Sequence, residues 1–188
     1  MKFSAILSLG AGLAAALPYS GLSKRTGVEA LDLGYKFLAD KPANAPEGYE
    51  VSVVFPNQKR SALPAALQRR QSPAKVSTSD FFECTNANPA PVSADCGVIV
   101  SNVLATGNDL IVAQGSCLVF SYRTCQAFFC SLCTTLTTST DFIGTQLDTV
   151  DALCVSGGQA GTIVGEEAPQ YEVGFVRSGA TLPNYDVC

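Results

Sequence analysis

Short runs of β-branched and aromatic residues, separated by turn residues, recur along the chain after residue 80, a pattern typical of strands. The predicted strands are residues 80–85, 110–113, 117–122, 126–132, 162–164 and 171–176. The threonine-rich residues 134–140 form a loop or the end of a strand. We expect these strands to pair in an antiparallel arrangement.

Two further segments carry apolar residues at helical spacing. The first begins at Ser93, which we expect to be the N-cap, has Asp95 in its first turn and ends in the turn of residues 106–109. The second is capped by Ser139 or Thr140 and ends at the glycine pair of residues 157–158. The apolar positions that define the buried faces are Cys96, Ile99, Val100 and Val103 in the first helix, and Ile143, Leu147, Val150 and Cys154 in the second.

The order of elements is strand, helix, strands, helix, strands. Two amphipathic helices and an antiparallel sheet bury one shared core by stacking as two layers. We therefore predict an α+β fold, a small disulfide-rich two-layer sandwich whose antiparallel sheet has two helices packed on one face.

The beginning of the chain has the features of a secretory signal. Lys2 precedes an apolar run that ends in the small residues Ala14, Ala15 and Ala16, as a cleavage site requires. The run is shorter than the roughly 20 residues that a membrane span needs, and no second apolar stretch follows. We expect residues 1–16 to be a signal peptide, the protein to be secreted and extracellular, and the chain to have no transmembrane segment.

Three pairs of basic residues follow the signal and end at Arg25, Arg60 and Arg70. A kexin-type protease of the secretory pathway cuts after such pairs. Residues 17–70 hold eight Lys or Arg and five Asp or Glu, net +3, whereas residues 71–188 hold three and eleven, net −8. We therefore expect a pro-segment at residues 17–70, which either inhibits the domain or assists its folding, and a mature disulfide-rich domain at residues 71–188.

Every cysteine lies in the predicted mature domain. An even number of cysteines in a short secreted domain is typical of a disulfide framework, so we expect four bridges. The Cys130-x-x-Cys133 spacing also occurs in zinc sites and redox pairs, but the chain has no histidine. We expect Cys84 to join Cys188, which would clamp the ends of the domain, and Cys96 to join Cys154, which antiparallel helices would bring together. The eight cysteines are Cys84, Cys96, Cys117, Cys125, Cys130, Cys133, Cys154 and Cys188.

The acidic balance of residues 71–188 argues against nucleic acid and anionic membranes as partners. Phosphate contacts need clustered basic residues, and only Lys75, Arg123 and Arg177 remain after Arg70. This charge balance leaves open a cationic or neutral partner, such as a basic protein or a glycan. We predict no cofactor and no metal.

Catalysis is not expected. The chain has no histidine, which excludes Ser-His-Asp and Cys-His arrangements. Two carboxylate pairs, Glu166 with Glu167 and Asp148 with Asp151, have the residue types of a glycosidase. The first pair lies in a predicted turn and the second on the polar side of a predicted helix, so solvated surface charge is the preferred interpretation.

The best candidate contact surface lies on adjacent predicted strands. Alternation places Phe128 and Phe129 on opposite faces, so at least one turns away from the helices unless another layer covers it. We expect that outward residue to form the surface together with Tyr122 and Arg123, because aromatic residues and arginine are favoured at binding hot spots.

Four short motifs together resemble the necrosis-inducing-factor family of secreted fungal effectors. They are Ser-Ala-Asp-Cys opening a helix at 93–96, Gly-Ser-Cys before a strand at 115–117, the helix at 141–153, and Gly-Gln-Ala-Gly at 158–161. The layout is also similar to that of fungal killer toxins, which are small disulfide-rich α/β sandwiches, some released by kexin-type cleavage. Cys125, Cys130 and Cys133, and the lack of a cysteine near Glu166, depart from the effector family.

The resemblance implies a secreted virulence or antagonism protein. Such an effector or killer-toxin-like protein acts by binding an unknown host or competitor protein or glycan, and is not a catalyst. The alternative is a carbohydrate-directed binder or a small acid–base glycosidase.

Overall fold

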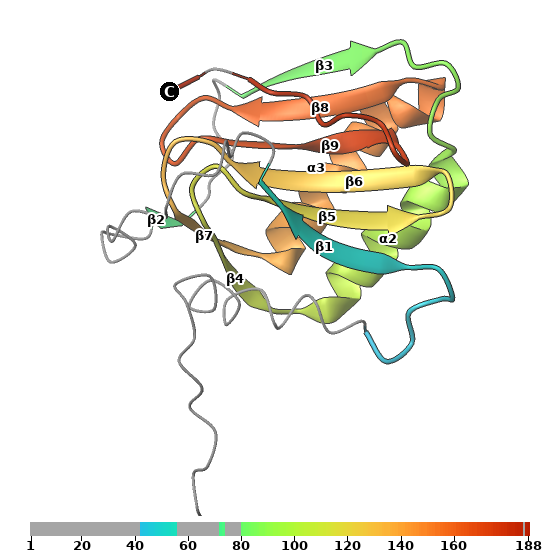
Figure 1. The fold of residues 1–188 in the computed structure, drawn as a ribbon, viewed down its shortest axis with the longest axis horizontal. Coiled ribbons are helices and arrows are strands. Elements are labelled where there is room, and N and C mark those ends of the chain that lie inside the picture. The colour runs from blue at the N-terminus through green and yellow to red at the C-terminus, as the bar shows by residue number, and fades with distance from the viewer. Residues whose placement is uncertain (1–41, 56–71, 74–79, 186) are drawn as a thin grey trace, which may run out of the picture.

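Six antiparallel strands form the main sheet of this protein (Figure 1). The computed structural model describes residues 42–55, 72–73, 80–185 and 187–188. Within them each neighbouring pair of strands in the main sheet is antiparallel. In spatial order the strands are β1 (Glu50–Val54), β5 (Cys117–Tyr122), β6 (Cys125–Ser131), β9 (Tyr171–Arg177), β8 (Ala160–Gly165) and β3 (Phe81–Thr85).

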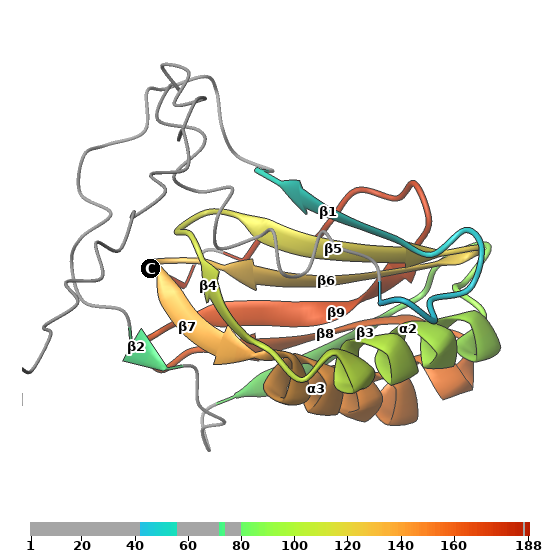
Figure 2. The same cartoon turned by 90° about the horizontal axis from the view of Figure 1, so that it is seen from below.

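Two helices, α2 (Ser93–Thr106) and α3 (Thr140–Leu153), lie side by side on one face of this sheet (Figure 2). The helix α2 packs against α3, β5 and β6, and α3 packs against β8 and β9. The predicted α+β two-layer sandwich, with both helices on one face of an antiparallel sheet, is therefore confirmed. Among the described residues, no helix has the length and apolar character needed to cross a membrane.

Smaller elements complete the fold. A second sheet has the order β2 (Ser72–Pro73), β7 (Leu136–Ser139) and β4 (Asp109–Val112), and a 3-10 helix, η1 (Val155–Gly157), follows α3. The pairing of β2 with β7 is parallel, and that of β4 with β7 is antiparallel. The threonine-rich segment left open as a loop or a strand end is thus largely strand.

The helix ends follow the sequence pattern with one correction. Ser139 is the N-cap of α3, where its hydroxyl oxygen accepts a hydrogen bond from the Phe142 N–H. The N-cap of α2 is Val92, and Ser93 is the first helical residue. Instead of capping its own helix, the Ser93 hydroxyl donates to the Asp151 carboxylate of α3 at 3.0 Å.

The core lies between the helices and the sheet and contains a strand that the sequence analysis did not predict. Strand β1 belongs to the predicted pro-segment, yet it pairs with β5. Tyr49, directly before it, is 1% exposed, and Val51 and Val53 pack against the core. The predicted signal peptide and the processing sites Arg25, Arg60 and Arg70 lie outside the described residues.

Four disulfides pair all eight cysteines, as predicted in number. Both predicted pairings are wrong. Cys96 of α2 faces the sheet and bonds to Cys125, the first residue of β6. Cys154, just after α3, bonds to Cys84 of β3. Each of the two therefore bonds to a strand cysteine and not to the other. The bonds are Cys84–Cys154, Cys96–Cys125, Cys117–Cys130 and Cys133–Cys188.

Candidate binding surface

An exposed arginine stands on the turn that joins β5 to β6. Arg123 has φ of 49°, a left-handed conformation that is uncommon for a residue with a Cβ. Its side chain is 70% exposed, and its guanidinium carbon lies 5.1 Å from the centre of the Tyr122 ring. Backbone strain of this kind is held only where neighbouring structure fixes it, and it clusters at functional sites.

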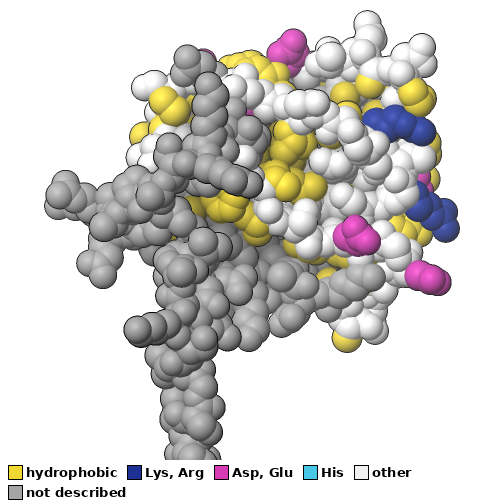
Figure 3. All heavy atoms as spheres, in the orientation of Figure 1, with side chains coloured by type: hydrophobic (Ala, Val, Ile, Leu, Met, Phe, Trp, Pro, Cys, Tyr) yellow, Lys and Arg dark blue, Asp and Glu magenta, His cyan; other side chains and the backbone are white. Residues whose placement is uncertain are grey.

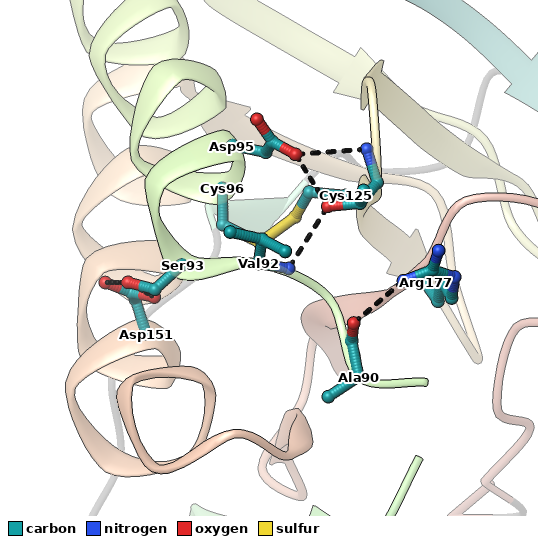
Figure 4. The surroundings of a disulfide bond; sticks show 9 residues. Ala90, Val92, Ser93, Asp95, Cys96, Cys125, Asp151 and Arg177 are labelled. Carbon is teal, nitrogen blue, oxygen red and sulfur yellow. Dashed lines mark hydrogen bonds between the residues drawn. A yellow bond between two sulfur atoms is a disulfide. The ribbon is translucent and has the colours of Figure 1, made fainter. Parts of the chain in front are cut away.

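The N-terminal end of α2 fixes this turn. The Asp95 carboxylate accepts hydrogen bonds from the Thr124 hydroxyl at 2.6 Å and from the Thr124 N–H at 3.3 Å. The Thr124 oxygen in turn accepts from the Val92 N–H at 3.2 Å. The adjacent Cys96–Cys125 disulfide adds a covalent tie at the same place (Figure 4). A helix N-terminus favours a carboxylate, so Asp95 suits both its helix and the turn.

Arg177 lies beside this turn because it ends β9 at the position that pairs with Cys125. Its Nη1 donates to the Ala90 carbonyl at 3.0 Å, which holds the loop before α2 (Figure 4). Arg123 and Arg177 are the two basic side chains among the described residues, and they lie near one another at one end of the molecule (Figure 3). The described part of the chain thus has its basic side chains at one place.

A groove of about 360 Å³ adjoins Arg177. It lies between the residues that follow β3, the paired ends of β8 and β9, and the tail after β9. Its polar side chains are Thr85, Asn88, Thr162, Arg177 and Thr181, and its lining includes no carboxylate. The groove and the two arginines form what we call the arginine end of the protein.

The four residues predicted as a contact surface do not form an exposed patch in this structure. Phe128 and Phe129 face opposite sides of the sheet, as alternation requires, but both are fully buried. Phe129 lies in the core under the helices, and Phe128 lies on the other face in a smaller apolar cluster, against which Leu182 of the C-terminal tail packs. Tyr122 is 7% exposed. The exposed member of the predicted set is Arg123. Phe128 is covered on its own face, where Leu182 of the C-terminal tail packs against its cluster.

The carboxylates weighed for catalysis lie elsewhere. Glu166 and Glu167 are exposed in the turn between β8 and β9, at the opposite end of these strands from Arg177. Asp148 is exposed on α3, and Asp151 accepts the hydrogen bond from Ser93. Burial raises the pKa of Asp151, the Ser93 hydrogen bond lowers it, and the charge of Asp148 raises it further.

A buried carboxyl group lies beside a disulfide on the face of the sheet away from the helices. Glu172 of β9 is 1% exposed, and burial raises its pKa to about 7, opposed by a hydrogen bond from the Tyr185 backbone. Among the described residues, its Oε2 has no hydrogen-bond partner. One of its carboxylate oxygens and the sulfur atoms of Cys117 and Cys130 lie within 4.8 Å of one another. Because these two sulfurs are bonded to each other, they are not thiolate ligands for a metal.

Two features of the arginine end were not predicted. From the sequence, Arg177 is only one of three basic residues after Arg70, and Asp95 is only a carboxylate in the first turn of a helix. Arg177 directly follows the predicted strand at residues 171–176, which was the one hint of its position. Only the pairing of β9 with β6, which the sequence does not give, places it beside Cys125.

No protein-family model and no curated protein sequence matches this chain. Its function is therefore inferred from the geometry described above and from the sequence pattern.

Proposed function

We propose that this chain is a secreted, kexin-processed effector or killer-toxin-like protein that acts by binding. Its target is a protein or glycan of a host or competitor cell, and the arginine end makes the contact. The four disulfides support the secreted, cysteine-rich class, because such bonds persist in oxidising compartments.

The observation that carries the proposal is the rigid presentation of Arg123. The Cys96–Cys125 disulfide and the hydrogen bonds of Asp95 to Thr124 hold a strained turn. Its Arg123 is 70% exposed, and Nη1 of Arg123 lies 3.9 Å from Oδ1 of Asp95 in an ion pair. A side chain fixed in advance loses less conformational entropy on binding, so affinity gained per contact is larger. Arginine is also enriched among the residues that dominate binding energy.

The placement of the carboxylates supports binding rather than catalysis. The groove at the arginine end has no carboxylate in its lining, and the pair Glu166 and Glu167 is at the other end of β8 and β9. A glycosidase needs two carboxyl groups roughly 5 to 10 Å apart across a substrate cleft.

The test measures binding of labelled mature protein to panels of plant and fungal cells. We expect Arg123→Ala to weaken saturable binding at least about tenfold, as loss of a hot-spot arginine does. Glu167→Ala, which removes an exposed charge at the opposite end of the strands, is the matched control and should bind as the wild type does. Equal binding by Arg123→Ala, or a reproducible hydrolytic turnover by the wild-type protein, would refute the proposal.

A second candidate is a carbohydrate-directed binder, favoured by the hydroxyl and amide groups of the groove. Thr85, Asn88 and Thr162 offer hydrogen-bond donors and acceptors beside the exposed apolar ring of Pro89. A glycan array probed with both the Arg123→Ala and the Asn88→Ala variants separates the two candidates, because only the second assigns the glycan contact to the groove. Saturable glycan binding that Asn88→Ala abolishes supports the carbohydrate-directed binder. If that binding persists when Glu166 and Glu167 are both changed to Gln, the protein binds the glycan without using these carboxylates for catalysis.

A further inference from the structure

One edge of the main sheet is formed by a strand that precedes two predicted processing sites. Strand β1 is the edge strand next to β5 (Figure 1). Its five residues pair in register with β5, from Glu50 opposite Ser121 to Val54 opposite Cys117. In the sequence, the pairs ending at Arg60 and Arg70 lie between β1 and β3. A cut at either pair breaks the backbone connection between β1 and the strands that follow it.

No covalent bond outside the backbone connects β1 to the domain. The first cysteine of the chain is Cys84, and all eight cysteines bond to one another within residues 84–188. After cleavage, the strand is therefore held only by its pairing with β5 and by packing.

The packing of β1 is that of a core strand. Tyr49 is 1% exposed, and burial raises the pKa of its hydroxyl. Val51 and Val53 pack against the core that contains Leu118 and Phe120 of β5. The side chains of Glu50 and Ser52, which alternate with them, are exposed. Loss of this strand would leave the backbone groups along one side of β5 unpaired and open the core where Tyr49 now lies.

We propose that the β5 edge is a strand-binding site and that residues 42–55 of the cleaved pro-segment remain there as a separate peptide. The processed protein is then a two-chain, non-covalent complex. The site takes an extended peptide with an aromatic residue followed by aliphatic residues at every second position, as in Tyr49, Val51 and Val53. Main-chain hydrogen bonds provide affinity and the alternate side chains provide specificity, as in other cases of strand addition.

The register makes the site selective. Because side chains alternate between faces, a slip of one residue would place Glu50 and Ser52 in the core and the valines in solvent. The inference rests on the processing that forms part of the proposed function, so its test uses a cut that is independent of the natural protease.

The experiment uses the full secreted chain with two changes. The basic pair at residues 59–60 is substituted so that it is not cut, and the pair at residues 69–70 is replaced by the recognition sequence of a site-specific protease. After the cut, native mass spectrometry and gel filtration determine whether the two fragments remain together. A labelled synthetic peptide of residues 42–55 is then added in excess to measure exchange. Variants are made only in this peptide, so that folding of the precursor is not affected.

We expect the fragments to co-elute as a one-to-one complex and the labelled peptide to exchange into it. A peptide with Tyr49→Ala should bind at least about 100-fold more weakly, because it leaves the buried pocket empty. A peptide with Ser52→Ala, changed at an exposed position of the same strand, should bind within about threefold of the wild-type peptide.

Three results would overturn the proposal. In the first, the domain separates from residues 42–55 and keeps its near-ultraviolet circular dichroism as a monomer. In the second, the domain pairs with a second copy of itself in place of the peptide. In the third, the Tyr49→Ala peptide binds as tightly as the wild-type peptide. Failure of the natural cut after Arg70 in a fungal host would instead count against the processing and would leave the strand-binding result intact.

Discussion

Glu172 gives this acidic protein an unusual dependence of stability on pH. Its pKa in the folded protein is about 7 because burial disfavours the charged carboxylate, whereas its ordinary value is 4.5. Between these two values the folded state retains a proton that the unfolded state releases, so the free energy of unfolding decreases as the pH rises. The stabilisation is fully present below about pH 4.5 and is lost by the time the pH has passed through 7.

The magnitude follows from the size of the pKa shift. A shift of this size at 1.36 kcal/mol per pH unit corresponds to about 3 kcal/mol between pH 4.5 and pH 8. A small domain has a free energy of unfolding of roughly 5 to 15 kcal/mol, so this change is readily measured. The chain has no histidine, which is the side chain whose ordinary pKa falls in this window, and among the described carboxyl groups Glu172 is the one whose pKa burial raises to about 7.

The assay is urea denaturation of the disulfide-bonded protein at pH 5 and at pH 8. We expect the wild type to be less stable at pH 8 by about 2 to 3 kcal/mol. Glu172→Gln keeps the size of the side chain and removes its ionisation, so the difference between the two pH values should largely disappear. Glu167→Gln, at an exposed position, should leave the difference unchanged. A Glu172→Gln protein that keeps the wild-type pH dependence would refute this explanation.

Two further predictions concern packing and cross-linking. Gly174→Ala should lower the free energy of unfolding by about 3 kcal/mol, because the new Cβ would lie 2.2 Å from the Gly161 carbonyl oxygen. The control Gly97→Ala, on α2 with no atom within 4 Å of its Cβ, should raise it by about 0.5 to 1 kcal/mol; equal effects in chemical denaturation would contradict the reasoning. Replacing Cys96 and Cys125 together by Ser should cost about 3 to 4 kcal/mol, given their separation of 29 residues, and a loss below about 1 kcal/mol would show that the bond does not hold the turn.

Local periodicity predicted most of the elements because strand and helix patterns depend on neighbours in sequence. The strand at residues 117–122 has the predicted bounds, and the buried faces of both helices are those that their apolar spacing indicated. Strand β1 has the same alternation, in Tyr49, Val51 and Val53. It was missed because its position before the basic pairs assigned it to a segment that was expected to be removed.

The disulfides and the binding surface needed the spatial order of strands. Cys96 and Cys154 lie at neighbouring ends of two packed helices, but the direction of each side chain toward the sheet decides its partner, and sequence spacing does not give that direction. Alternation likewise placed Phe128 on the face away from the helices. It did not reveal that Leu182, more than fifty residues later in the sequence, packs against that face.

The most direct test of the central claim is the mass of the naturally secreted protein, intact and reduced, together with sequencing of every N-terminus present. We predict a chain that starts at Gln71 and gains the mass of eight hydrogens on reduction, as four disulfides require. A single chain that starts near Leu17, or free thiols before reduction, would contradict the claim that this is a processed, disulfide-framed secreted binding protein.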